Sequence, residues 1–284
     1  MLPEEAEAKA YIQHRHRAAL DGMSQLHTLA VSALTPFRTT TKPGFDETVH
    51  LVSLALYVKA CKQFRSIQLL CEAGLGADAN AVTRNLFETA IALAFVLRAR
   101  IRLKRGGKPV PKVKGRPFGR RLRARLFLAH VAFEKQRTLD EWSRTPGLKR
   151  SAKSKIDATI VAQGVVEAEG AIGKEWTDQL RKGKSYSGLT LKELVQSLRL
   201  GQIYATLYRA GSWSVHGGAD IGQFVTETAG GPALLLAASD AEIEPAMGGA
   251  SVLMTICLGL LEDAYSLRLS SAIKTHRLRL GMKR

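Results

Sequence analysis

The 284-residue chain has few cysteines and lacks the common metal and nucleotide motifs. Its three cysteines, Cys61, Cys71 and Cys257, form no CxxC pair and cannot all join in disulfides. This usage is typical of a reducing compartment, in which thiols serve as small buried apolar groups. Because HExxH, the P-loop and clusters of Cys and His are absent as well, we expect neither a metal ion nor a cofactor.

The sequence also lacks the features that direct a chain into or across a membrane. It opens with Met-Leu-Pro-Glu-Glu, which places two acids where a secretory signal has basic residues and an apolar run. The longest uncharged apolar stretch, 245–261, falls just short of spanning a bilayer and contains several glycines, so we expect a buried core helix there. These absences predict a soluble cytoplasmic protein without a membrane partner.

Acidic residues are missing from one long segment. The chain has 42 Lys and Arg against 25 Asp and Glu, and 13 of the cations lie between Arg98 and Arg125. Such a block predicts contact with RNA or another polyanion, and a solvated loop that serves solubility is the alternative. The candidate nucleic-acid-binding residues are Arg98, Arg100, Arg102, Lys104, Arg105, Lys112, Lys114, Arg116, Arg120, Arg121, Arg123 and Arg125.

Apolar residues recur at helical spacing over most of the chain, which predicts an all-α fold. We expect a multi-helix bundle in a single domain, with a basic loop insertion and one small β-hairpin. Residues 106–117 are rich in Gly and Pro and predict an irregular basic loop, whereas residues 224–237 predict the hairpin. The expected helices cover about 4–34, 49–71, 78–103, 118–144, 149–171, 176–182, 190–198, 202–216 and 240–273.

Local signals mark several ends of these helices. Pro36 ends the first helix, Asp46 caps the second, Gly74 stops it, and Thr190 caps the helix that follows it. The predicted parts of the chain are an N-terminal helix (1–45), a helical domain (46–275) with the basic insertion at about 98–125, and a basic C-terminal tail (276–284).

The stretch from Tyr204 to Gly218 places Arg209 seven residues before His216. Seven residues are almost two turns of an α-helix, so both side chains are expected on one face, with Ser212 between them. A guanidinium that holds phosphate and an imidazole that transfers a proton suit phosphodiester cleavage without a metal. The alternative is structural: Arg209 pairs with a buried carboxylate, His216 caps the helix end, and Ser212 bonds to the carbonyl of Tyr208.

A second constellation lies on the helix expected at 78–103. Arg84 and Glu88 are four residues apart and share a face, and the surrounding residues are apolar enough to be buried. Buried charges need partners, so Glu88 or the earlier Glu72 is expected to orient Arg209, while Arg84 adds a second cation. An internal ionic clamp between helices is the alternative.

Both constellations resemble a widespread bacterial helical family of unknown function. The resemblance rests on Cys71-Glu-Ala-Gly and Arg84-Asn-Leu-Phe-Glu88 within residues 65–95, and on the run from Tyr204 to His216. It covers roughly residues 50–270 and implies an all-helical domain.

The Arg-x6-His spacing also resembles the signature of HEPN domains, the higher-eukaryote and prokaryote nucleotide-binding superfamily. That superfamily is all-helical and includes metal-independent RNases of toxin–antitoxin and phage-defence systems. The resemblance implies that Arg209 binds the phosphate and His216 transfers protons, in a site that commonly forms across a homodimer.

The leading interpretation is a metal-independent endoribonuclease, in which the 2′-hydroxyl attacks the adjacent phosphate. A toxin or phage-defence role would bring a neutralising partner protein. Two alternatives stay open. One is a non-enzymatic module that binds nucleic acid or an acidic protein, with Arg209 and His216 structural. The other is a helical sensor of a small anionic ligand.

Overall fold

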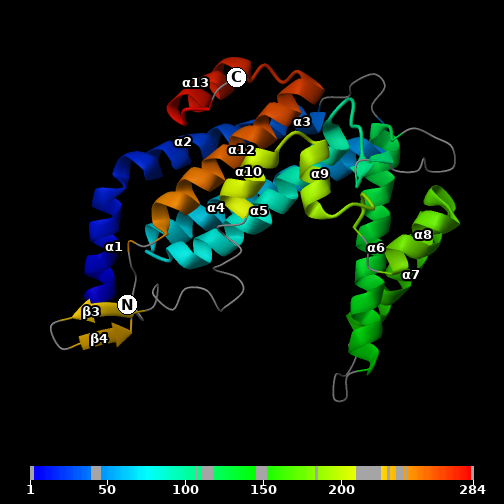
Figure 1. Ribbon diagram of the computed structural model, residues 1–284, viewed down its shortest axis with the longest axis horizontal. Coiled ribbons are helices and arrows are strands. Elements are labelled where there is room, and N and C mark those ends of the chain that lie inside the picture. Colours follow the sequence, from blue (N-terminus) through cyan, green and yellow to red (C-terminus); the bar gives the residue numbers. More distant parts are fainter. Residues whose placement is uncertain are drawn as a thin grey trace. The chain divides into compact units, whose positions relative to one another are not determined.

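The protein is described here by a computed structural model, shown in Figure 1. It describes residues 3–39, 46–106, 108–109, 118–144, 152–182, 185–208, 225–228, 231–234, 240 and 242–282. The fold is all-α, as predicted, and the chain forms two compact units. Unit 1 comprises Met1–Pro43, Leu54–Ala94 and Gln202–Arg284, and unit 2 comprises Gly44–Ser53 and Phe95–Gly201. The prediction of one helical domain with boundaries near residues 45 and 275 stays a prediction.

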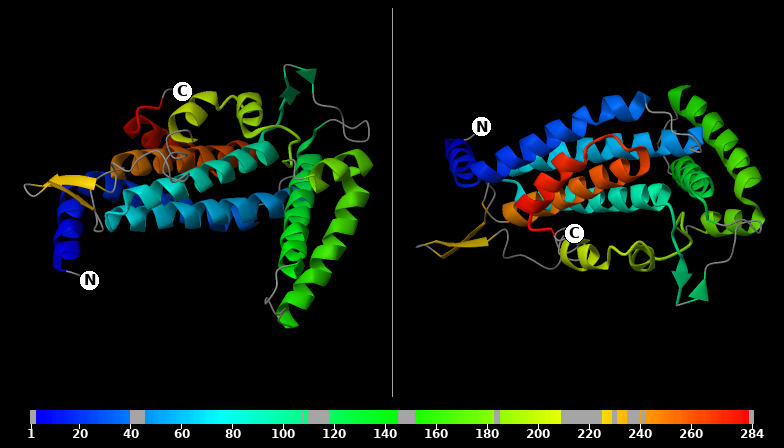
Figure 2. Two further views of the ribbon diagram at one scale, coloured as in Figure 1. Left: turned by 60° about the horizontal axis from the view of Figure 1, so that its bottom comes forward. Right: turned by 90° about the horizontal axis from the view of Figure 1, so that it is seen from above.

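Unit 1 is a bundle of long helices, as predicted. Helices α2, α4, α5 and α12 run side by side in Figures 1 and 2, and α12 packs against both α2 and α13. Its elements are α1 (Pro3–Arg15), α2 (Arg17–Ser32), α3 (Leu34–Thr39), most of α4 (Glu47–Glu72), of α5 (Gly76–Leu97) and of α10 (Gly201–Ile203), the π-helical turn η1 (Tyr204–Tyr208), the strands β3 (Val225–Thr228) and β4 (Gly231–Leu234), α12 (Ile243–Tyr265) and α13 (Ser270–Arg279).

Aromatic rings and small residues fill the core of unit 1. Phe37 lies edge-on to Tyr265 with ring centroids 4.6 Å apart, and the hydroxyl of Tyr57 donates to the carbonyl of Ala30 at 2.8 Å. Burial of these groups supplies the main driving force for packing the helices together. The three cysteines are free and buried, so the prediction that they act as small apolar groups is confirmed.

Helix α12 contains the apolar stretch at 245–261. It is the one helix among the described residues that is long and apolar enough to cross a membrane, and most of it is buried inside the protein. Residues such as Met254 and Leu258 are fully covered by neighbouring helices. A core helix passes the same length and composition test, so the prediction of a buried core helix is confirmed.

The N-terminal region differs from the single helix predicted over 4–34. The chain leaves helical geometry at His16, whose side chain is buried and bonded to the carboxylate of Asp240. Pro36 does not end a helix. It is the third residue of α3, in the first turn, where a missing backbone N–H breaks no bond within the helix.

The C-terminal region also departs from prediction, because the helix expected over 240–273 is two helices. Ser266 and Arg268 have φ angles of 57° and 63°, which end α12. The carboxylate of Glu262 then accepts from the backbone N–H of Leu269 at 3.0 Å and from the hydroxyl of Ser270 at 2.6 Å, which fixes the start of α13. The predicted tail at 276–284 therefore contains the last turn of a helix.

Unit 2 is built on the pair α6 (Arg120–Arg144) and α7 (Ala152–Ile172), which pack along each other (Figure 2). Both agree with the predicted ranges within a few residues. The ring of Tyr186 lies among Phe95, Phe127 and His130, with centroid distances of 5.2, 5.3 and 5.6 Å. The remaining elements are α8 (Lys174–Arg181), α9 (Leu191–Ser197), β1 (Lys104–Arg105) and β2 (Lys108–Pro109).

Helix caps predicted from single residues are confirmed in both units. The Asp46 carboxylate accepts from the backbone N–H of Thr48 at 2.7 Å, and Gly74 follows α4 with φ 80°. At the start of α9, Thr190 and Glu193 form a reciprocal capping box.

Two antiparallel hairpins accompany the helices. Strands β3 and β4 pair Val225 with Leu234 and Thr228 with Gly231, which confirms the predicted hairpin. Strands β1 and β2 pair Lys104 with Pro109. The prediction that 106–117 lacks regular structure is therefore wrong at Lys108 and Pro109, and residues 110–117 lie outside the described residues.

Candidate functional site

The central residues of the predicted Arg–His site lie outside the described residues. They are Arg209, Ser212 and His216, and of Tyr208 only the backbone is described. Residues 204–208 form a π-helical turn, which corrects the α-helix predicted over 202–216 at that point. The roles of Arg209 and His216 therefore stay predictions.

The structure does bring the start of this stretch against α5. The ring of Tyr204 lies 6.2 Å from that of Phe87, which is fully buried on α5. Phe87 directly precedes Glu88, and the Nε of Arg84 lies 3.8 Å from the Glu88 Oε1. The turn of α5 that carries the second constellation therefore also receives the first residue of the Tyr204–Gly218 stretch.

The Arg84–Glu88 pair is less buried than predicted. The side chain of Arg84 is 18% exposed and that of Glu88 is 50% exposed. At such exposure the i,i+4 ion pair by itself contributes little to stability. The roles predicted for Arg84 and Glu88, and the alternative of an ionic clamp between helices, stay predictions.

Glu72 has partners of its own on α4. Its Oε1 accepts from the Nε2 of Gln68 at 2.8 Å and lies 3.8 Å from the Nη1 of Arg65. These contacts place Glu72 in a local α4 network, and its predicted role in orienting Arg209 stays a prediction.

The predicted basic segment divides into exposed and structural residues. Arg100, Arg102 and Lys104 are exposed. The side chain of Arg105 is not described, and Lys112, Lys114 and Arg116 lie outside the described residues.

Three arginines of the segment cap the ends of helices instead. Arg120 donates from Nε to the carbonyl of Leu97 at 2.6 Å, and Arg123 donates to the carbonyl of Arg98, so both act at the end of α5. Arg98 in turn donates to the carbonyl of Leu198 at the end of α9. Cations are favoured there because the last carbonyls of a helix lack partners and carry partial negative charge.

Arg123 is the clearest correction to the nucleic-acid-binding set. Its side chain is fully buried, and its guanidinium carbon lies 5.8 Å from the centre of the Phe95 ring. Burial, and then the nearby charge of Arg120, lower its pKa to about 10. A guanidinium without access to solvent cannot reach a phosphate, so Arg123 belongs to the core of unit 2.

The last two arginines of the set lie on α6. Arg121 is exposed and pairs with the carboxylate of Asp46. The pKa of Asp46 is lowered mainly by its hydrogen bonds from Thr48, and further by Arg121 and Arg125. Arg125 also lines a groove between α6 and α7. Both remain accessible at the surface of unit 2.

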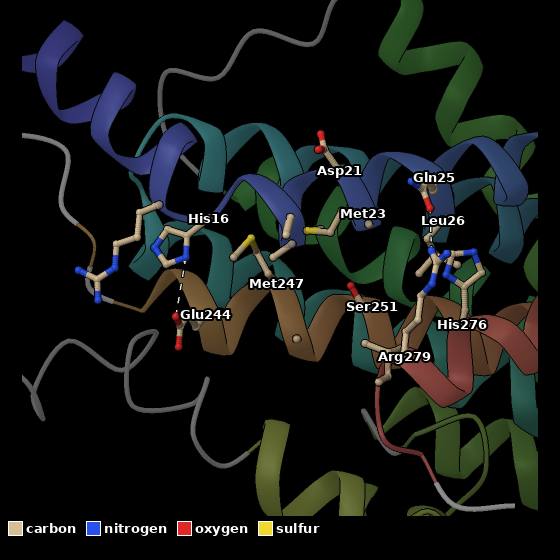
Figure 3. A pocket seen from close by; sticks show the side chains of 16 residues that line it. His16, Asp21, Met23, Gln25, Leu26, Glu244, Met247, Ser251, His276 and Arg279 are labelled. Atoms are coloured by element: carbon tan, nitrogen blue, oxygen red, sulfur yellow. Dashed lines mark hydrogen bonds and ion pairs between the residues drawn. The ribbon is translucent and has the colours of Figure 1, made fainter.

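Unit 1 carries a cleft of about 670 Å³ that sequence analysis missed (Figure 3). It runs between α2, α12 and α13. At one end the buried His16 bonds through Nε2 to Asp240, and its Nδ1 lies 3.8 Å from the Glu244 Oε1. Arg15 also pairs with Asp240, at 2.8 Å.

The other end of the cleft is formed by α13. Arg279 donates from Nη1 to the Gln25 Oε1 at 2.7 Å (Figure 3). The two lining arginines, Arg15 and Arg279, are offset by the lining carboxylates of Asp21 and Glu244. This balance gives the cleft no preference for an anion, so it does not support the interpretation as an anion sensor.

Gly248 widens the cleft from α12. A Cβ added there would meet nothing within 4 Å, and the residue lies inside the helix. Glycine costs an interior helical position about 0.5–1 kcal/mol relative to alanine. We therefore expect Gly248→Ala to raise the free energy of unfolding by about 0.5–1 kcal/mol in urea denaturation. Gly259→Ala is the comparison: its Cβ would lie 2.9 Å from the Arg277 Nη2, so a smaller gain is expected. A loss of stability in Gly248→Ala would contradict the open geometry.

The described residues contain no group of three or more His, Cys, Asp or Glu side chains placed to hold a metal ion.

A comparison with protein families covers both constellations. Residues 50–232 match the family of unknown function DUF5677, from α4 to β4, which is more than half of the chain. The chain belongs to this family. The DUF5677 match includes Arg84, Glu88, the basic segment and the stretch from Tyr204 to Gly218, whereas α12 and α13 lie beyond it. No curated protein and no solved structure matches the chain.

Proposed function

We propose that this DUF5677 protein is a HEPN-like, metal-independent endoribonuclease. The observation that supports the proposal is the contact between Phe87 and Tyr204, because it brings the first residue of the Tyr204–Gly218 stretch to α5, the helix that also carries Arg84 and Glu88. In this proposal His216 moves the proton and Arg209 holds the phosphate, while Arg84 adds positive charge nearby.

The reaction proposed is an internal transfer. The 2′-oxygen of a ribose attacks the adjacent phosphorus as its proton leaves to a base. The bond from phosphorus to the 5′-oxygen of the next nucleotide breaks, and that oxygen takes up a proton. The products are a 2′,3′-cyclic phosphate and a 5′-hydroxyl. His216 supplies proton transfer, and Arg209 stabilises the charge that develops on the phosphoryl oxygens.

We propose a cytoplasmic homodimer as the active species and a toxin or phage-defence role, with a neutralising protein as partner. These rest on the likeness to HEPN domains. A non-enzymatic RNA-binding role is the second candidate. The exposed Arg100, Arg102 and Lys104 favour it, because they suit contact with a phosphate backbone without any catalytic group.

Incubation of the purified protein with mixed RNA in EDTA tests the proposal. We expect cleavage products that carry 2′,3′-cyclic phosphate and 5′-hydroxyl ends, identified by their response to phosphatase and polynucleotide kinase. The same RNA with 2′-O-methyl groups should stay intact, because the attacking hydroxyl is blocked. Products with 5′-phosphate ends, or cleavage that EDTA abolishes, would contradict the proposed chemistry. RNA binding without cleavage would favour the second candidate.

A further inference from the structure

Unit 2 contains a cationic cavity between α9 and the β1–β2 hairpin. Its volume is about 510 Å³, within the range of about 300–1,000 Å³ that small-molecule sites occupy. Helix α9 and strand β1 are in contact. The lining residues are Arg102, Lys104, Gly106, Glu193, Gln196, Ser197 and Arg199.

The charge of the cavity is positive. Three of its lining residues are cations, and Glu193 is the one carboxylate. Both oxygens of Glu193 are already engaged. Its Oε1 accepts from the backbone N–H of Gly106 at 3.0 Å, and its Oε2 accepts from the backbone N–H and hydroxyl of Thr190 at 3.0 and 2.9 Å. Glu193 therefore holds the hairpin on α9, and its single negative charge offsets one of the three cations, so the lining side chains keep a net positive charge.

Two of the cations come from alternate positions of the chain. Leu103, between Arg102 and Lys104, is buried, while both cations are exposed. This alternation places them on one side of the backbone, as in a strand. Both side chains line the same cavity, from β1 in the case of Lys104 and from the residues just before it in the case of Arg102.

The third cation, Arg199, ends α9 in a conformation that favours glycine. Its φ is 54°, and its N–H donates to the carbonyl of Gln196 at 3.0 Å. The N–H of Leu200 donates to the carbonyl of Val195 at 2.9 Å. Together these bonds form a Schellman motif, in which the left-handed position is usually glycine.

The same chain ends two other helices with this motif and uses glycine both times. After α4, Gly74 has φ 80°, and after α13, Gly281 has φ 64°, each with the same pair of backbone hydrogen bonds. An arginine at this position costs free energy that glycine would avoid. Left-handed residues other than glycine concentrate at functional sites, and the side chain of Arg199 is exposed and lines the cavity.

We infer that the cavity binds a phosphate of a single-stranded RNA through Arg102, Lys104 and Arg199. The Gln196 amide adds a neutral donor to the same phosphate or its sugar. The choice of RNA rests on the proposed function, and the phosphate chemistry rests on the cavity itself. The site would hold an RNA strand on unit 2.

Arg199→Gly tests this inference in the full-length protein. It removes the cation and restores the residue that the backbone favours, so the melting temperature should stay the same or rise by a few degrees. We expect the Kd for a labelled 2′-O-methyl RNA oligonucleotide, measured by anisotropy in EDTA, to rise about tenfold. The slope of log K against log salt should fall by about 0.7, the value for one lost phosphate contact on a single strand.

Arg268→Gly is the matched control. Arg268 is also an exposed arginine at positive φ, 63°, and lies in unit 1, outside the cavity. Its replacement by glycine removes the same charge and relieves similar backbone strain, but outside the cavity lining, so the Kd for the RNA should change less than twofold. Because the 2′-O-methyl strand cannot be cleaved, this assay measures retention independently of the nuclease reaction.

Three outcomes would overturn the inference: no change in Kd for Arg199→Gly, equal losses for Arg199→Gly and Arg268→Gly, or an unchanged salt slope. A free nucleotide is the other source of a phosphate. If adenosine monophosphate stabilises the wild-type protein thermally but not Arg199→Gly, and the RNA affinity of the two proteins is the same, the ligand of the cavity is a nucleotide and not an RNA strand. If the inference fails while RNA is still cleaved, the proposed nuclease stands.

Discussion

Replacing His216 by alanine should lower the rate of RNA cleavage by about 10²–10⁴-fold, the contribution that a positioned acid–base group makes. Arg209→Ala should lower it by about 10²–10³-fold, because the charge on the phosphoryl oxygens loses its stabilising cation. Arg209→Lys keeps the charge and loses the planar fork that binds two phosphate oxygens, so an intermediate rate is expected. Single-turnover cleavage of an unmodified RNA oligonucleotide in EDTA measures all three.

His14→Ala is a suitable control, because His14 is an exposed residue of α1. This variant should cleave at the wild-type rate. The double variant Arg209→Ala/His216→Ala should cleave only a little more slowly than the slower of the two single variants. The losses in rate are not additive when two groups act on the same step. Cleavage at the wild-type rate by both Arg209→Ala and His216→Ala would show that neither residue is catalytic. If Arg209→Ala does not fold and the wild-type protein does not cleave RNA, Arg209 has a structural role.

Arg123→Ala should lower the free energy of unfolding by about 3 kcal/mol. The change leaves a cavity beside Phe95 and removes the donor to the carbonyl of Arg98 at the end of α5. Arg123→Met should stay within about 1 kcal/mol of wild type. Methionine fills much of the same space and avoids burying a charge whose Nε and Nη1 find no acceptor among the described residues. Urea denaturation at equilibrium measures both.

Arg121→Ala controls for the loss of one positive charge from the same helix. Arg121 is exposed and its ion pair with Asp46 lies at the surface, so the change should cost less than about 1 kcal/mol. Equal stability of Arg123→Ala and Arg121→Ala would show that Arg123 does not belong to the core. A Met variant as unstable as the Ala variant would show that the charge itself is required.

The sequence is a good guide to the helices whose ends have local causes. Asp46, Gly74 and Thr190 mark real ends of α4 and α9, because caps act through bonds to neighbouring backbone groups. The break at His16 could not be predicted in this way, since its partner Asp240 is 224 residues away. The turn after α12 contains no glycine or proline that would mark the end of a helix, and the apolar pattern continues through it. The sequence therefore predicts one helix where the structure has two.

The candidate site divides in the same way. The composition of the sequence reveals the basic segment. The structure is needed to show which of its arginines are exposed and can contact a ligand. One signal for Arg123 was present: Leu126, Ala129 and Phe133 follow it on the buried face of α6. Arg199 gave no comparable signal, because a left-handed arginine looks like any other arginine in a sequence. The cleft beside His16 joins segments from both ends of the chain, which periodicity cannot bring together.

The buried cysteines have a chemical consequence of their own. Burial raises the pKa of Cys61 to about 11 and that of Cys71 to about 12, and it raises the pKa of Cys257 as well. The thiolate is the form that attacks peroxides and alkylating agents, so at neutral pH these sulfurs are almost inert in the folded protein. Oxidation of these three cysteines requires the core to open, and the rate at which an alkylating reagent labels the thiols therefore measures how often the core opens.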